Sequence, residues 1–204
     1  MAQPIHNPLI RRAIKEQTIQ YINFAPPAAD DNYFKTSTAL AAASTTLAAA
    51  SMTKSYVPAG VAVCPVCVVT NDWASGEEDW TSVSVLFVGI DQFGDLITTT
   101  ATGTVASHVW TATSAKAFLT LTKIVITITA GDGEAVDASD SYVLGFAKTY
   151  GLGCAIGVSG DVIVHNLDGA TDAGTISTAH NTYLVAGTPD AAKLLQLYIR
   201  STAP

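Results

Sequence analysis

Two cysteines three residues apart are the first residues of this chain whose types and spacing could do chemistry. Cys64 and Cys67 lie in the stretch V-A-V-C-P-V-C-V-V, residues 61–69. A C-x-x-C pair is typical of redox centres, where one thiol lies at a helix N-terminus, and it can also supply half of a zinc site. The flanking residues are rich in valine and have no helical periodicity, which favours a β-strand. We therefore expect buried, apolar cysteines, with a redox pair and a zinc site as alternatives.

The spacing of these cysteines also limits what they can share. Successive side chains of a strand point to opposite faces, so residues three apart lie on different faces of the sheet. A common metal ion or a disulfide between Cys64 and Cys67 would need a β-bulge at Pro65. The other candidate zinc ligands, none of them at a usual ligand spacing, are Cys154, His6, His108, His165 and His180.

Acidic side chains gather in two further segments. A hard cation such as Ca²⁺ prefers several oxygen ligands from one flexible loop, so a cation site is conceivable there. The spacing does not match an EF-hand loop, and solvated turns are the preferred interpretation. We predict no metal, no cofactor and no enzymatic activity, because the chain also lacks G-x-S-x-G, P-loop and H-E-x-x-H motifs. The acidic residues are Glu77, Glu78 and Asp79 in one segment, and Asp132, Glu134, Asp137 and Asp140 in the other.

The composition favours a subunit of an assembly. Charged residues make up 13% of the chain and hydrophobic residues 49%, whereas an ordinary soluble domain has about 25% charged residues. Thr, Ser, Ala and Gly take the place of charge, and such a surface permits close approach of another chain. The formal charge of −7 argues against a nucleic-acid partner, which calls for a basic face. No apolar run approaches the roughly 20 residues that span a bilayer, so no membrane partner is expected.

Most of the chain has a β-type pattern. From Val61 onward, short runs rich in Val, Ile, Thr and aromatic residues alternate with turns that contain Gly, Asn and Asp. Within 81–88 and 124–129, apolar and hydroxyl side chains largely alternate, as in a strand with one buried face. We expect an all-β fold, an antiparallel β-sandwich or jelly-roll-like domain of β-tulip type. The expected strands are 61–70, 80–90, 96–102, 106–112, 116–130, 142–146, 162–164, 181–185 and 194–200.

The first 35 residues differ from the rest. Asn7 and Pro8 resemble a helix start, and apolar residues then recur at helical spacing, which predicts a short basic amphipathic helix over 8–22. The sequence A-P-P at 25–27 should end any regular element, and residues 30–32 should continue as loop. This organisation predicts a helical or extended arm over 1–35, a low-complexity connector over 36–60 and a β-rich domain over 61–204. The connector could be helical or extended.

Several pieces of the chain, taken in order, resemble a family of structural proteins in tailed-phage virions. The stretch from Val83 to Gly103 contains S-V-L-F-V-G-I-D-Q-F-G-D-L-I-T-T-T-A-T-G, a strand, a G-x-D-x-x-G turn and a threonine-rich return strand. C-P-V-C-V-V precedes it, and T-A-T-S-A-K-A-F-L-T-L-T-K-I follows. S-Y-V-L-G-F-A-K-T-Y-G-L-G-C-A-I and D-A-A-K-L-L-Q-L-Y-I-R resemble the later strands. The likeness covers about residues 56–200, but the basic N-terminal helix and the two cysteines depart from the family pattern.

The resemblance implies a capsid decoration (cement) protein. Such a protein binds the outer surface of the shell and bridges neighbouring copies of the major capsid protein, often as a homotrimer. We therefore expect a virion protein that is made in the host cytoplasm. The alternatives are a head-fibre or tail-associated adhesin, a carbohydrate-binding module and a head–tail connector. The residues expected to contact the capsid are the basic Arg11, Arg12 and Lys15 and the apolar Ile10, Ile14 and Ile22.

Overall fold

A computed structural model describes residues 17–40, 42–57, 60–72, 80–129 and 136–202. The prediction of an all-β fold is confirmed, because 58% of the chain is strand and the sheets are antiparallel, in an arrangement consistent with a β-sandwich. The described helices are single 3₁₀ turns at Ala49–Ser51 and Ser159–Asp161. Within these ranges, no helix combines the length and the apolar character that crossing a membrane requires.

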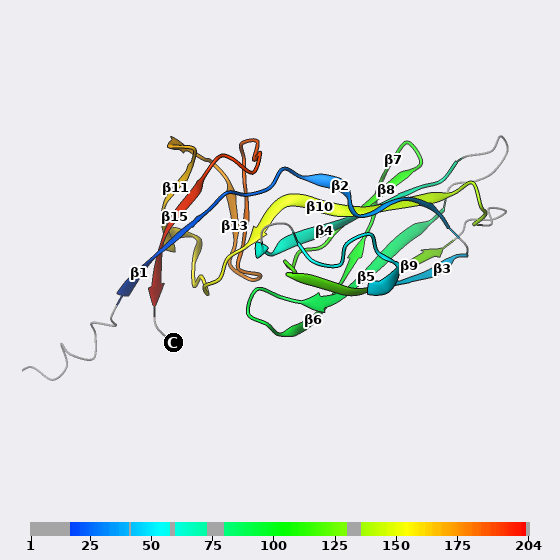
Figure 1. Ribbon diagram of the computed structural model, residues 1–204, viewed down its shortest axis with the longest axis horizontal. Helices are drawn as coiled ribbons and strands as arrows, with labels where there is room; N and C mark the ends of the chain where they lie inside the picture. The colour runs from blue at the N-terminus through cyan, green and yellow to red at the C-terminus, as the bar shows by residue number, and fades with distance from the viewer. Residues whose placement is uncertain (1–16, 41, 58–59, 73–79, 130–135, 203–204) are drawn as a thin grey trace, which may run out of the picture.

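Figure 1 shows an elongated molecule, with β1, β11 and β15 toward one end and β3, β7, β8 and β9 toward the other. Their bounds are β1 Gln17–Phe24, β2 Asp30–Ala39, β3 Ser44–Ala48, β4 Val63–Thr70, β5 Ser82–Ile90, β6 Leu96–Thr102, β7 Thr104–Ala106, β8 Val109–Thr113, β9 Thr120–Thr129, β10 Ser141–Gly151, β11 Val162–Leu167, β12 Ala170–Thr171, β13 Thr175–Ser177, β14 Thr182–Leu184 and β15 Leu195–Thr202.

Two sheets form the larger body of the molecule. One has the order β13-β14-β10-β4-β8-β7, with β2 also paired to β10, and the other has the order β3-β9-β5-β6 (Figure 1). Strict alternation in β5 places Val83, Val85 and Phe87 in the core, all 0% exposed, while the residues between them are half-buried. Burial of one face of each sheet supplies most of the driving force for this packing.

A third sheet lies at the end of the molecule where β1 is drawn, and its order is β1-β15-β11-β12 (Figure 1). β1 pairs with β15 in antiparallel fashion over its whole length, from Gln17 opposite Thr202 to Phe24 opposite Leu195. The inward side chains Leu197 and Ile199 are fully buried and belong to the same hydrophobic cluster as the sandwich core. One continuous core therefore joins this sheet to the larger body.

The close approach of β2 to β10 explains a glycine. A Cβ atom built on Gly145 of β10 would lie 1.8 Å from the backbone oxygen of Asp30 on β2. No side chain fits in that space, so the crossing of the two strands depends on glycine at this position.

The helix predicted over 8–22 is wrong for residues 17–22, which form most of β1; residues 8–16 lie outside the described ranges. Pairing with β15 and burial of the inner face outweigh the weak helical periodicity. Residues 30–32 begin β2, so the loop expected there is also wrong. Residues 36–39 and 44–48 are strands, which is the extended alternative for the connector. The A-P-P sequence does end β1, at Phe24.

Candidate functional site

Cys64 and Cys67 are buried packing residues of β4. Both side chains are 0% exposed, and burial raises the pKa of each thiol to about 12. Cys67 belongs to the main core, whereas Cys64 packs with Ala62 and Ala117 in a separate cluster. The predictions of burial and of opposite faces are therefore confirmed. A redox or zinc site needs thiolates, which are scarce at neutral pH when the pKa is this high.

The residues expected to contact a capsid are only partly placed. Ile10, Arg11, Arg12, Ile14 and Lys15 lie outside the described ranges. Ile22 lies in β1 opposite Leu197 and packs against the protein's own core. Its apolar surface is therefore already engaged within the chain.

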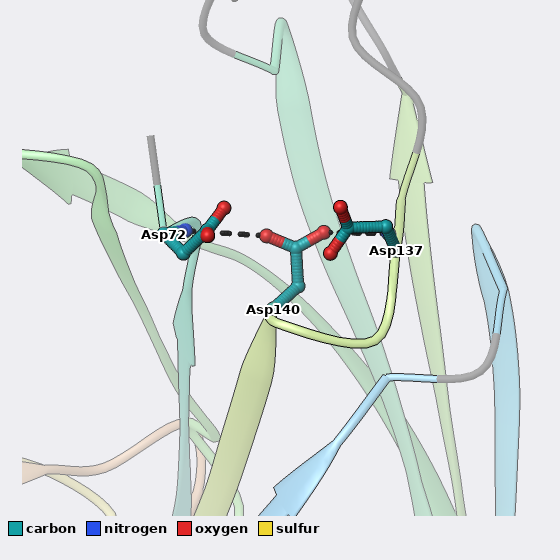
Figure 2. Close-up of side chains that lie close together, drawn as sticks. All are labelled: Asp72, Asp137 and Asp140. Carbon is teal, nitrogen blue, oxygen red and sulfur yellow. Dashed lines mark hydrogen bonds between the residues drawn. The ribbon is translucent and has the colours of Figure 1, made fainter. Parts of the chain in front are cut away.

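Three carboxylates from two loops lie together beside the paired strands β4 and β10 (Figure 2). Asp72 follows β4, and Asp137 and Asp140 precede β10, with one oxygen of each carboxylate within 4.8 Å of the others. The antiparallel pairing of Thr70 with Ser141 brings these loops together. The sequence placed Asp137 and Asp140 in one acidic loop but missed Asp72, because its proximity depends on strand pairing across the fold.

The buried Asp140 organises this acidic cluster. One of its carboxylate oxygens accepts the backbone N–H of Asp72 at 3.2 Å and the other accepts that of Asp137 at 2.9 Å (Figure 2). The exposed Asp137 accepts the hydroxyl and the backbone N–H of Ser139, and these hydrogen bonds lower its pKa. Carboxylates in this arrangement could bind a hard cation such as Ca²⁺. The hydrogen bonds give Asp140 a structural role of its own, which is to hold the two loops together.

A second polar network lies between β11, β14 and the segment that joins them. The hydroxyl of Tyr183 donates to Oδ2 of Asp172 at 2.7 Å, and Nδ1 of His165 lies 2.9 Å from the same hydroxyl. The single proton of the Tyr183 hydroxyl is used in the hydrogen bond to Asp172, so the hydroxyl can only accept from His165. Nδ1 of His165 therefore carries a proton and donates it to the hydroxyl oxygen. Asp172 is 4% exposed and also accepts the backbone N–H groups of Ala186 and Gly187.

The hydrogen bonds determine the charge state of this network. Burial acts to raise the pKa of Asp172, but the hydrogen bonds from Tyr183, Gly187 and Ala186, together with the charge of His165, outweigh burial and lower the pKa. Burial and the adjacent carboxylate raise the pKa of Tyr183 well above its ordinary value. Asp172 is thus an anion that closes the turn before β15, and each of its two carboxylate oxygens accepts at least one hydrogen bond from the protein.

Three hollows in the described part of the surface are small. One of about 150 Å³ lies beside the turn between β5 and β6, and others of about 330 and 290 Å³ lie near β12 and β14. Ligand pockets usually measure about 300–1,000 Å³, so these hollows fall at or below the lower end. The first contains an exposed aromatic ring, Phe93, beside Lys116 and His180. A single aromatic ring in so small a hollow gives weak support to a sugar-binding site.

No family model, curated protein or solved structure matches this chain.

Proposed function

We propose that this chain is a non-enzymatic virion structural protein that binds the outer surface of a tailed-phage capsid and stabilises the shell. The ordered resemblance of the sequence pieces suggests this class of protein. C-P-V-C-V-V is β4, and the G-x-D-x-x-G turn joins β5 to β6, with Gly94 at a φ of +89°. In this turn Oδ1 of Asp91 accepts the backbone N–H groups of Phe93 and Asp95.

The observation that carries the proposal is an exposed strand surface that is almost free of charge. The outward side chains of β6 are Leu96, Thr98, Thr100 and Thr102, and all four are exposed. β7, which follows it, is exposed over Thr104–Ala106. Covering hydroxyl and apolar side chains with another protein costs less desolvation free energy than covering the charged side chains of Lys or Glu. Such a surface is suited to broad contact with neighbouring subunits of the major capsid protein.

The proposed mechanism requires no reaction. Many weak contacts, made by several copies on one shell, add up to tight attachment through multivalency. A protein that binds the assembled shell but not separated capsid subunits stabilises the shell by linkage. In this proposal Arg11, Arg12 and Lys15 pair with capsid carboxylates, and Ile10 and Ile14 pack into an apolar groove.

The experiment mixes the purified protein with heads that lack decoration, then measures bound copies and the resistance of the heads to heat and osmotic shock. We expect many copies per head and a higher temperature of head disruption. The triple variant R11A/R12A/K15A should bind at least tenfold more weakly, whereas K123A, which changes an exposed lysine of β9, should bind like the wild type. Absence of binding would contradict the proposal. A single ring of copies would identify a connector, and binding to host glycans but not to heads would identify an adhesin.

A further inference from the structure

The sheet β1-β15-β11-β12 has an outer face and an edge that the described part of the chain leaves uncovered. β1 is the terminal strand of the sheet, and β15 is its one partner among the described strands. The inner face of β15 is fully buried at Leu195, Leu197 and Ile199. The outer face therefore presents the side chains that alternate with these.

The outer face contains large apolar side chains at its edge. Ile19 is 65% exposed and Tyr21 48% exposed on β1, and Tyr198 is 40% exposed on β15. Tyr21 lies opposite Tyr198 with 4.8 Å between the ring centroids, and Nε2 of Gln196 donates to the Tyr21 hydroxyl at 3.0 Å. Ile163 of β11, beside the bulge in its pairing with β15, is 45% exposed. Exposed apolar side chains thus lie on three strands and reach the free edge, and the exposed Arg200 lies opposite Ile19 on the same face.

The edge strand lacks the features that protect edges from pairing. Its sequence, Q-T-I-Q-Y-I-N-F, has no charged residue and no proline, and these are the usual means by which proteins prevent strand addition. The edge of an antiparallel strand offers the N–H and C=O groups of alternate residues to a further strand. β6 is also a terminal strand, but there Nζ of Lys116 donates to the backbone oxygen of Thr98 and places a cation on the strand.

We propose that a second copy of this chain pairs with β1, strand to strand and antiparallel, about a two-fold axis perpendicular to the sheet. Residues directly opposite each other in an antiparallel pair have their side chains on the same side of the sheet. The two-fold axis must therefore lie midway between the two copies of one residue, because an axis level with a peptide bond would pair residues whose side chains point to opposite sides. An axis at Gln20 places Ile19 opposite Tyr21 of the second copy, and the same contact recurs on the other side of the axis. Both exposed apolar residues of the edge then gain an apolar neighbour.

The charge distribution favours a second copy as the occupant. The chain has a formal charge of −7, so two copies repel each other over most of their surface. The described strands of this sheet contain no Asp, Glu or Lys, and Arg200 is their one Arg. The β1 edge is therefore a surface where like charges do not oppose self-association.

This pairing closes at two copies, and it differs from the trimer that the resemblance implies. We expect light scattering of the full chain to give twice the 21.1 kDa chain mass. The variant I19K should halve the mass, because two buried lysines would face apolar partners. Residue 19 is mostly exposed, so the variant should keep the circular dichroism spectrum of the wild type. The matched control is V105K, at a position 50% exposed on the terminal strand β7, and it should leave the mass doubled.

A cysteine cross-link tests the register. With the axis at Gln20, the Cα atoms of the two Gln20 residues lie about 4.5–5.5 Å apart. This distance is within the range of about 4.4–6.8 Å between Cα atoms that disulfides span. Q20C should therefore give a disulfide-linked dimer on mild oxidation. N23C should not, because its two copies would lie about 20 Å apart along the strands. A wild-type monomer, a trimer, a dimer that survives I19K, or cross-linking of N23C in preference to Q20C would overturn the proposal. None of these results depends on capsid binding, so failure of the function proposed above is a separate outcome.

Discussion

Asp172 is a buried residue whose ionised form supports the fold through several hydrogen bonds. Replacement by Asn keeps the shape but substitutes a donor for one of two acceptor oxygens, which bond Tyr183, Ala186 and Gly187. We expect D172N to lower the free energy of unfolding at pH 7 by about 1–3 kcal/mol, measured by urea denaturation. The matched control is D168N, because Asp168 is exposed in the neighbouring turn and Asn tolerates its positive φ of 54°.

The same variant has a distinct pH dependence. The pKa of Asp172 is lowered in the folded protein, so its contribution to stability is present above the unfolded-state pKa of about 3.9 and is lost as pH falls through the folded pKa. The wild type should therefore lose more stability than D172N between about pH 4 and pH 2. Equal acid sensitivity of the wild type and D172N would contradict this assignment.

At the same scale, sequence reasoning succeeded where the neighbours along the chain decide the outcome. The valine-rich flanks of Cys64 and Cys67 are enough to predict a buried strand with the two thiols on opposite faces. The grouping of Asp72 with Asp137 and Asp140 depends on which strands pair, and the Asp172–Tyr183–His165 network depends on side-chain contact between strands of two different sheets. Neither can be obtained from local spacing.

Among the elements, β1 changes how the N-terminal arm should be tested. The sequence favoured a helix up to Ile22, because Thr18, Tyr21 and Ile22 also fit a helical period. Residues 21–24 instead alternate between exposed side chains, at Tyr21 and Asn23, and side chains that pack on the core, at Ile22 and Phe24. When a short segment fits both the helical and the strand period, its tertiary partner determines which secondary structure it adopts. Here the partner is β15, which lies far from β1 in the sequence.

Two truncations should therefore behave differently. Deletion of residues 1–16 keeps every described contact, and we expect an unchanged midpoint of urea denaturation. Deletion of residues 1–25 removes β1 and uncovers Leu197 and Ile199, so it should cost on the order of 2–4 kcal/mol, from the loss of two partly buried side chains and the exposure of those beneath them. The shorter deletion is thus the proper test of capsid attachment. If it destabilised the protein as much as the longer one, the separation of arm and strand at Gln17 would be wrong.

Across the whole molecule, the first and last described strands are neighbours. Gln17 lies opposite Thr202, so the structure closes only when the C-terminal strand has been made. At about 5–20 residues per second, β1 waits roughly 10–40 s on a translating ribosome for its partner. Throughout that interval an uncharged strand with two open edges is exposed to other chains, which is a risk of misassembly before any native contact competes.

The pairing of β1 with β15 also suggests how the delay before β1 finds its partner could be shortened. A permuted chain could join Thr202 to Gln17 by a short hairpin turn and begin instead at the exposed Gly153. This order would turn the most distant strand pair of the sequence into a local hairpin. We expect it to refold at least several-fold faster than the natural order in stopped-flow fluorescence, since local pairing reduces the loop-closure entropy of the transition state. Equal refolding rates would place the β1–β15 pairing after the rate-limiting step. In the natural strand order, the sheet that contains β1 and β15 can therefore form only after β15 has been synthesised.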